Sequence, residues 1–165
     1  MLGHFGVGKT SLVRRFVHGI FSEDYISTVG ALVVQKKLES LPTNAQGADQ
    51  LTFILWDLAN VEKMSPLVIN HFTRSDGAII VTDLCRPKSF DEDLIQIKKF
   101  IELNPAAKLI FAGNKVDLVQ PPQRDLQPLQ TIAQNYKAPF LLTSAKSGDN
   151  VQTLFETLAE SILNA

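Results

Sequence analysis

The stretch GHFGVGKTSLVRRF, residues Gly3–Phe16, decides the fold of this chain. Its first eight residues fit the pattern G-x-x-x-x-G-K-[ST], in which glycines let backbone N–H groups curve around phosphate oxygens. Apolar residues follow at helical spacing, so we expect the loop to stand at a helix N-terminus, where anions are favoured. The alternative interpretation is a glycine-rich helix start with an exposed lysine.

The loop predicts a phosphate site with two side chains of distinct roles. The Lys9 ammonium would neutralise the outer phosphates, and the Thr10 hydroxyl would ligate Mg²⁺. The expected nucleotide-binding residues of this segment are Gly3, Gly6, Val7, Gly8, Lys9, Thr10 and Ser11. Only Met1 and Leu2 precede the loop, whereas a strand leading into it needs roughly five or six residues. We therefore expect the natural chain to begin upstream, which a native mass with Met1 as its first residue would contradict.

Length and composition predict one globular domain over residues 1–165, with 45% apolar and 20% charged residues. The net charge of −1 does not favour a nucleic-acid partner. The single cysteine, Cys85, excludes an internal disulfide and favours a reducing, cytoplasmic location. We expect Cys85 to be a small core residue at a strand end. No apolar run is long enough to span a bilayer, and the C-terminus has no cysteine for a prenyl anchor.

Strand and helix patterns alternate along the chain. Continuous or alternating apolar runs predict strands at 31–38, 51–58, 77–84, 108–114 and 139–145. Helical spacing marks the segment after the phosphate loop and the segments 90–103, 129–136 and 151–162. This alternation predicts a three-layer α/β fold with a mostly parallel central sheet and helices on both faces. Ligands of such sheets bind at the carboxyl ends of the strands.

Two further motifs stand at the carboxyl ends of predicted strands, NKVD at 114–117 and TSAK at 143–146. Together with the phosphate loop they resemble the motifs of the Ras-like small GTPases, the Rab branch most closely. FSEDYISTVG (Phe21–Gly30) resembles a Rab switch I. The Asp117 carboxylate can accept hydrogen bonds from the N1–H and amino group of guanine, a donor pair that adenine lacks. Taken alone, NKVD also fits a polar turn after a strand.

The resemblance implies a role for each base-site residue. Asn114 would tie the base site to the phosphate loop, the stem of Lys115 would cover the base, and the Ala145 N–H would meet the guanine O6. The remaining implied nucleotide-binding residues are Phe21, Tyr25, Thr28, Ser144 and Lys146. For Mg²⁺ it implies Thr10, Thr28 and Asp57, with Asp57 acting through water.

The segment WDLANVE, Trp56–Glu62, departs from the Rab pattern W-D-T-A-G-Q-E. Asn60 replaces the glycine that meets the γ-phosphate, and Val61 replaces the glutamine that orients the attacking water. The implied catalytic positions are Lys9, Thr28, Asn60 and Val61. Phe5 occupies a phosphate-loop position where many relatives keep a small residue. We hypothesise an apolar lid of Phe5 and Val61 over the γ-phosphate; alternatively, Phe5 packs under a switch and another group positions the water.

These features predict a molecular switch that binds GTP or GDP with Mg²⁺ and hydrolyses GTP slowly. Its expected partners are protein effectors and exchange or activating proteins. One alternative is a hydrolysis-deficient binding module that acts through a fixed surface, favoured by Asn60, Val61 and Phe5. Another is a P-loop ATPase or kinase, which a competition between ATP and GTP would distinguish.

Overall fold

The computed structural model describes residues 1–22, 31–38, 51–58, 69, 72–86, 90–119 and 126–164. Its elements alternate as the sequence predicts. In chain order they are α1 (Lys9–His18), β1 (Ala31–Leu38), β2 (Leu51–Leu58), β3 (Gly77–Asp83), α3 (Phe90–Leu103), β4 (Lys108–Asn114), the 3-10 turn η2 (Val116–Leu118), α4 (Gln127–Asn135), β5 (Phe140–Leu142) and α5 (Val151–Leu163).

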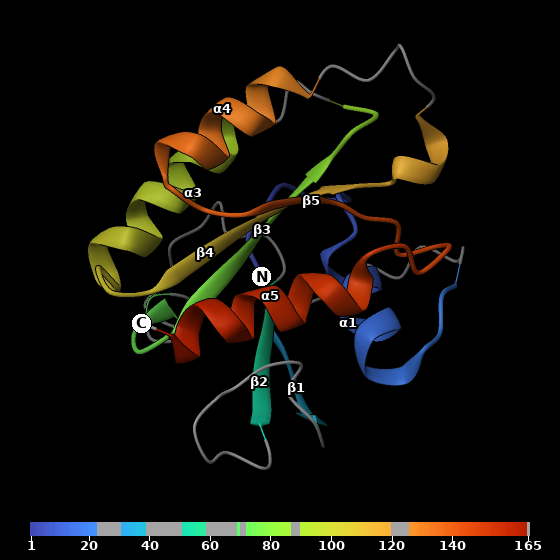
Figure 1. Ribbon diagram of the computed structural model, residues 1–165, viewed down its shortest axis with the longest axis horizontal. Coiled ribbons are helices and arrows are strands. Elements are labelled where there is room, and N and C mark those ends of the chain that lie inside the picture. Colours follow the sequence, from blue (N-terminus) through green and yellow to red (C-terminus); the bar gives the residue numbers. More distant parts are fainter. Residues whose placement is uncertain are drawn as a thin grey trace.

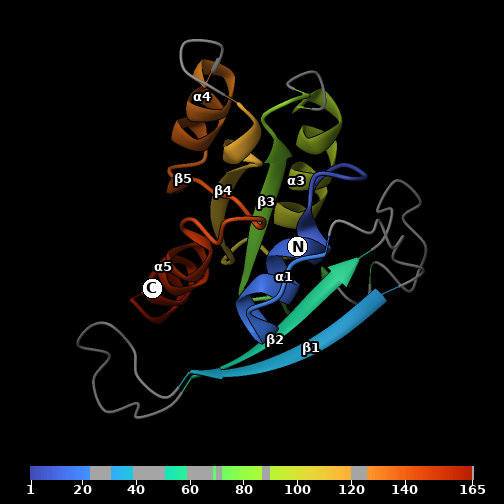
Figure 2. The same cartoon turned by 90° about the vertical axis from the view of Figure 1, so that its right-hand side faces the viewer.

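The strands form two hydrogen-bonded sheets. β3, β4 and β5 are parallel neighbours, with Gly77 opposite Lys108 and Asp83 opposite Asn114. Every residue of β3 and β4 after the first is buried, as expected for strands covered on both faces. β1 and β2 form an antiparallel ribbon, which runs along the lower part of Figure 2.

Two residues join the sheets. Leu2 bridges to Ile80 in parallel: its N–H donates to the Ile79 carbonyl at 2.9 Å, and its carbonyl accepts from the Val81 N–H at 2.9 Å. On the other side, the Met1 ammonium donates to the Trp56 carbonyl at 2.8 Å. A cleft of about 490 Å³ continues from these residues between β2 and β3.

Helices cover both faces of the three-stranded sheet. α3 and α4 lie on one face and α5 on the other, together with α1 (Figure 1). β3 supplies both cores, because alternate side chains point to opposite faces: Ile79 and Val81 to one, Ala78 and Ile80 to the other.

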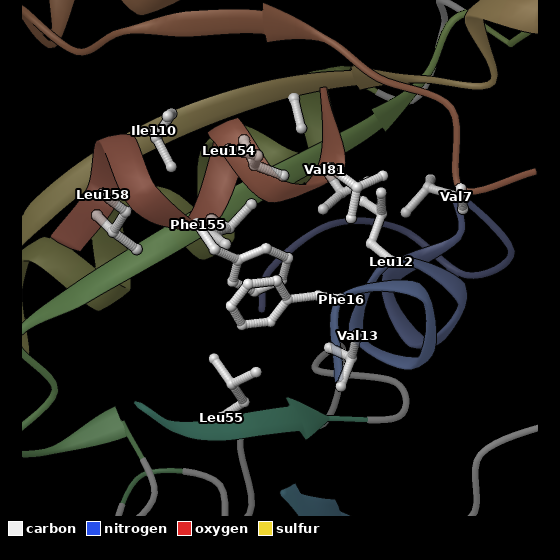
Figure 3. Close-up of a cluster of buried hydrophobic side chains, with 14 of the residues drawn as sticks. Val7, Leu12, Val13, Phe16, Leu55, Val81, Ile110, Leu154, Phe155 and Leu158 are labelled. Carbon is white, nitrogen blue, oxygen red and sulfur yellow. The ribbon is translucent and has the colours of Figure 1, made fainter. Parts of the chain in front are cut away.

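The core beneath α1 and α5 also reaches the two-stranded ribbon. Phe16 of α1 stacks on Phe155 of α5 with ring centroids 3.9 Å apart, and Leu55 of β2 packs in the same cluster (Figure 3). Phe53 and Phe16 form a T-shaped ring pair, at a centroid distance of 5.6 Å. These aromatic contacts hold α1, and therefore the phosphate loop before it, against α5 and β2.

The predicted three-layer α/β fold is confirmed. The expectation for Cys85 is wrong: β3 ends at Asp83, so Cys85 falls in the following turn and is exposed. Loss of part of its hydration and the nearby Asp83 carboxylate raise the pKa of its thiol. Within the described part of the chain, no helix has the length and apolar character needed to cross a membrane.

Candidate nucleotide-binding site

The phosphate loop closes against the ends of two strands. At Gly3, with φ 130°, a Cβ would lie 2.2 Å from the Val81 carbonyl oxygen. At Gly8, with φ 101°, a Cβ would lie 2.3 Å from Nδ2 of Asn114. Both positions therefore require glycine for space and for backbone conformation. These two glycines allow the loop to pack closely against β3 and β4.

Lys9 carries a buried positive charge inside the loop. Its Nζ donates to the carbonyls of Gly3 at 2.7 Å and His4 at 2.9 Å. Only 8% of the residue is exposed. Thr10 and Ser11 stand in the first turn of α1, where backbone N–H groups lack helical partners. The ammonium and the helix start together make the loop suited to an anion.

Thr10 and Asp57 provide oxygen atoms suited to Mg²⁺. The Thr10 hydroxyl donates to one Asp57 carboxylate oxygen. Asp57 is 1% exposed, and its other oxygen, Oδ1, has no hydrogen-bond partner among the described residues. A buried, unpaired carboxylate oxygen beside a hydroxyl fits a hard cation that takes few protein ligands. When bound, Mg²⁺ neutralises charge on the phosphates.

Asn114 joins the base motifs to the phosphate loop. Its Nδ2 donates to the Val7 carbonyl at 2.9 Å, and its Oδ1 accepts from the Thr143 hydroxyl and the Ala145 N–H, each at 3.3 Å. The Ser144 hydroxyl donates to Asp117 at 2.6 Å. NKVD, TSAK and the phosphate loop thus meet at the carboxyl end of the sheet.

Sequence analysis did not identify Asp83 and Arg86 as site residues. Lys115, at φ 66°, donates from Nζ to the Gly6 carbonyl at 2.8 Å and to Asp83 at 2.7 Å. Arg86 donates to the same Asp83 oxygen at 2.9 Å and to the Phe5 carbonyl at 3.4 Å. Burial acts to raise the pKa of Asp83, but hydrogen bonds from Lys115, the Cys85 N–H and Arg86 outweigh it and leave that pKa lowered. The position of Asp83 at the end of β3 is the one signal that could have revealed it.

Three other residues that the sequence singles out differ in their exposure. Phe21 is partly buried against the core of α1 and α5, Lys146 is exposed, and Phe5 is 50% exposed. The remaining expected residues lie outside the described part of the chain: Tyr25, Thr28, Asn60 and Val61.

The chain is similar to known proteins over almost its whole length. The model of the Ras family matches residues 1–164. Ras-related protein Rab5A of Oryza sativa subsp. japonica is 33% identical over 168 residues, covering 99% of this chain and 78% of that protein. Ras-related protein Rab-1A of Dictyostelium discoideum is 32% identical over 167 residues, covering 99% and 79%. Ras-related protein Rab-24 of the same organism is 28% identical over 165 residues, covering 97% and 77%.

Ras-family proteins are GTP-binding switches that take GTP or GDP with Mg²⁺ and act with protein partners. In this chain the Thr10 hydroxyl bonds to Asp57, and Asn114 and Ser144 bond the two base motifs to the phosphate loop and to each other. The chain belongs to the Ras family, and its sequence is similar to the Rab proteins.

Proposed function

We propose that this chain is a nucleotide-dependent switch that selects guanine and hydrolyses bound GTP slowly. The observation that carries the proposal is the Asn114 side chain, which bonds to the phosphate loop and to the TSAK loop at once. One nucleotide can therefore occupy both loops in a fixed relative position. Asp117 would accept the two guanine donors while Ser144 holds its carboxylate in place.

Slow hydrolysis is supported by the identity of three residues. Val61 has no group that can orient water, and Asn60 has a Cβ where relatives have the freedom of glycine. Phe5 adds an apolar ring to the phosphate loop and remains half exposed. Lys9, Thr10 and Asp57 would still hold phosphate and metal, so binding and hydrolysis are separable in this site.

The β1–β2 ribbon offers a surface for protein effectors. Val33 lies opposite Trp56 across the ribbon, and Ile54 lies two residues along on the same face. Val33 is 48% and Ile54 62% exposed. β2 also carries Asp57, so nucleotide and metal bound at the site contact the strand that supports this face. Apolar side chains gathered on one face mark an interaction surface.

A single-turnover assay tests the proposal. The protein is offered GTP or ATP with Mg²⁺, freed of excess nucleotide, and its bound nucleotide is followed by chromatography. We expect GTP to be retained in preference to ATP and to convert to GDP over hours. Retention of ATP, or no retention, would refute guanine selection. Conversion within minutes would refute slow hydrolysis.

The second candidate function, a binding module that does not turn over, is favoured by the same substitutions at 60 and 61. This second function predicts that bound GTP is not converted to GDP however long it is followed. The double variant F5G/V61Q tests why hydrolysis is slow or absent. If an apolar lid and the missing glutamine slow the reaction, this variant hydrolyses GTP faster than the wild type. An unchanged rate would exclude the lid.

A further inference from the structure

Arg15, in the last turn of α1, reaches the TSAK loop. Its Nε donates to the Ala145 carbonyl at 2.9 Å, and a second nitrogen of the guanidinium donates to the Lys146 carbonyl. The remaining one donates to the Gly19 carbonyl at 2.8 Å. Figure 1 shows the loop between β5 and α5 turning beside α1. One side chain thus holds a loop 130 residues away in the sequence.

The two carbonyls in the TSAK loop belong to consecutive peptide groups. Because a trans peptide is planar, its N–H points opposite to its carbonyl, so the N–H groups of Lys146 and Ser147 point away from Arg15. The Ser147 N–H accordingly donates to the Ser144 hydroxyl at 3.0 Å, and this hydroxyl donates to Asp117. Arg15 therefore holds the loop on the side opposite to the base-recognition site. The N–H groups of Lys146 and Ser147 point toward that site.

The third hydrogen bond of Arg15 is made to Gly19, which caps the C-terminal end of α1. Gly19 caps the helix at φ 70°, and its N–H donates to the Arg15 carbonyl at 2.9 Å. A cation here is also favoured by the helix dipole. Lysine would supply a single nitrogen, whereas the planar guanidinium supplies three donor positions in a fixed fork. Each of the three guanidinium nitrogens donates one of the three bonds.

We propose that Arg15 is a positioning residue for guanine: by holding the Ala145 and Lys146 carbonyls it directs the Lys146 N–H at the O6 oxygen of the base, while the Ser147 N–H stays bonded to the Ser144 hydroxyl. This inference rests on the proposed guanine site. It predicts that loss of Arg15 weakens the contact with O6 and speeds nucleotide release, while the contacts with the phosphates are unchanged.

The test measures dissociation rates of fluorescently labelled diphosphates from wild type, R15Q and R15K, with R14Q as the matched control on the same helix. Arg14 makes no hydrogen bond or ion pair with the part of the chain that the structure describes. Three ligands are compared. GDP and inosine diphosphate both carry O6, and the diphosphate of 2-aminopurine riboside lacks it.

Loss of charge-assisted hydrogen bonds should speed release of GDP and inosine diphosphate from R15Q by roughly ten- to a hundredfold. R15K, which keeps the charge but not the fork, should release them faster than wild type even if R15Q fails to fold. R14Q should match wild type. Wild type and the Arg15 variants should release the 2-aminopurine nucleotide at equal rates, because this nucleotide lacks the O6 oxygen through which Arg15 is proposed to act.

Equal acceleration with all three ligands would show general loosening and overturn the inference. Rates for R15Q and R15K equal to those of R14Q would overturn it as well. Failure of wild type to bind GDP would instead refute the proposed function, and with it this inference. Binding by wild type therefore separates the two failures.

Discussion

At the scale of single residues, Asp83 is a buried charge that pairs with two basic side chains of the site. Its side chain is 2% exposed, and it receives both Lys115 and Arg86, which are 30% and 55% exposed. A buried carboxylate is stable only when its partners compensate for the lost hydration. Its lowered pKa shows that they do, so its contribution to stability is present above the ordinary value of 3.8 and is lost as the pH falls through the folded pKa.

The substitution D83N should lower the free energy of unfolding at pH 7 by about 1.5–3 kcal/mol, because charge-assisted bonds to Lys115 are lost. Urea denaturation measures the change. The control is E102Q, which removes an exposed pair with Lys99 (43% and 64% exposed) and should stay within about 0.5 kcal/mol of wild type. Equal effects of the two substitutions would contradict a role for buried charge.

Sequence motifs locate the loops of the site but not the residues whose hydrogen bonds hold these loops in place. GHFGVGKT, NKVD and TSAK are contiguous patterns, and the structure brings them together through the side chain of Asn114. Asp83, Arg86 and Arg15 act on segments 32, 81 and 130 residues distant. No local pattern encodes such a pairing, because it exists only once the sheet has placed the strand ends together.

At the scale of elements, the phosphate loop depends on its fit against β4. G8A would place a methyl group 2.3 Å from the Asn114 amide and force apart its bond to Val7. G19A is the matched control, since Gly19 also has positive φ but nothing within 4 Å of its Cβ position. Left-handed strain alone costs about 1–3 kcal/mol.

We therefore expect G8A to lose about 2 kcal/mol or more beyond the loss of G19A, because a buried amide is left without its acceptor. Thermal unfolding of both variants beside wild type gives the comparison. G8A should also fail to retain GDP, whereas G19A should retain it. A loss no greater than that of G19A would mean that the loop can move without breaking the Asn114 bond.

The bounds of β1, β2, β4 and α3 agree with their sequence patterns. Each is a long apolar or periodic run between polar or turn residues, so burial and period coincide. β5 is shorter than its apolar run suggests, with three residues. Beyond it, side chains of the TSAK loop bond to Asn114 and Asp117 instead. The turn η2 is too short for any period, and its start at Lys115 needs a left-handed conformation that the sequence does not signal.

At the scale of the whole molecule, the two sheets share one core but little backbone pairing. Phe16 and Phe155 fill the space between them, and Leu2 supplies the bridge to β3. The Met1 ammonium is consequently buried between the sheets. Loss of hydration lowers its pKa from 8.0 to about 6; the Asp57 carboxylate opposes this shift and Lys9 adds to it.

In a chain whose first residue is Met1, this buried amine should make the free energy of unfolding depend on pH between 6 and 8. Its folded pKa lies below its unfolded value, so the unfolded chain binds more protons in this window and stability rises with pH. A difference of two pKa units corresponds to about 2.7 kcal/mol. We would measure unfolding by urea at fixed GDP and Mg²⁺ concentrations, for the chain beginning at Met1 and for the same chain acetylated on that amine. The acetylated chain lacks this titration. Its advantage over the free amine should therefore grow as the pH falls from 8 to 6 and stay constant on either side. A difference that is independent of pH would show that the amine reaches solvent, and that Met1 does not lie fixed between the sheets.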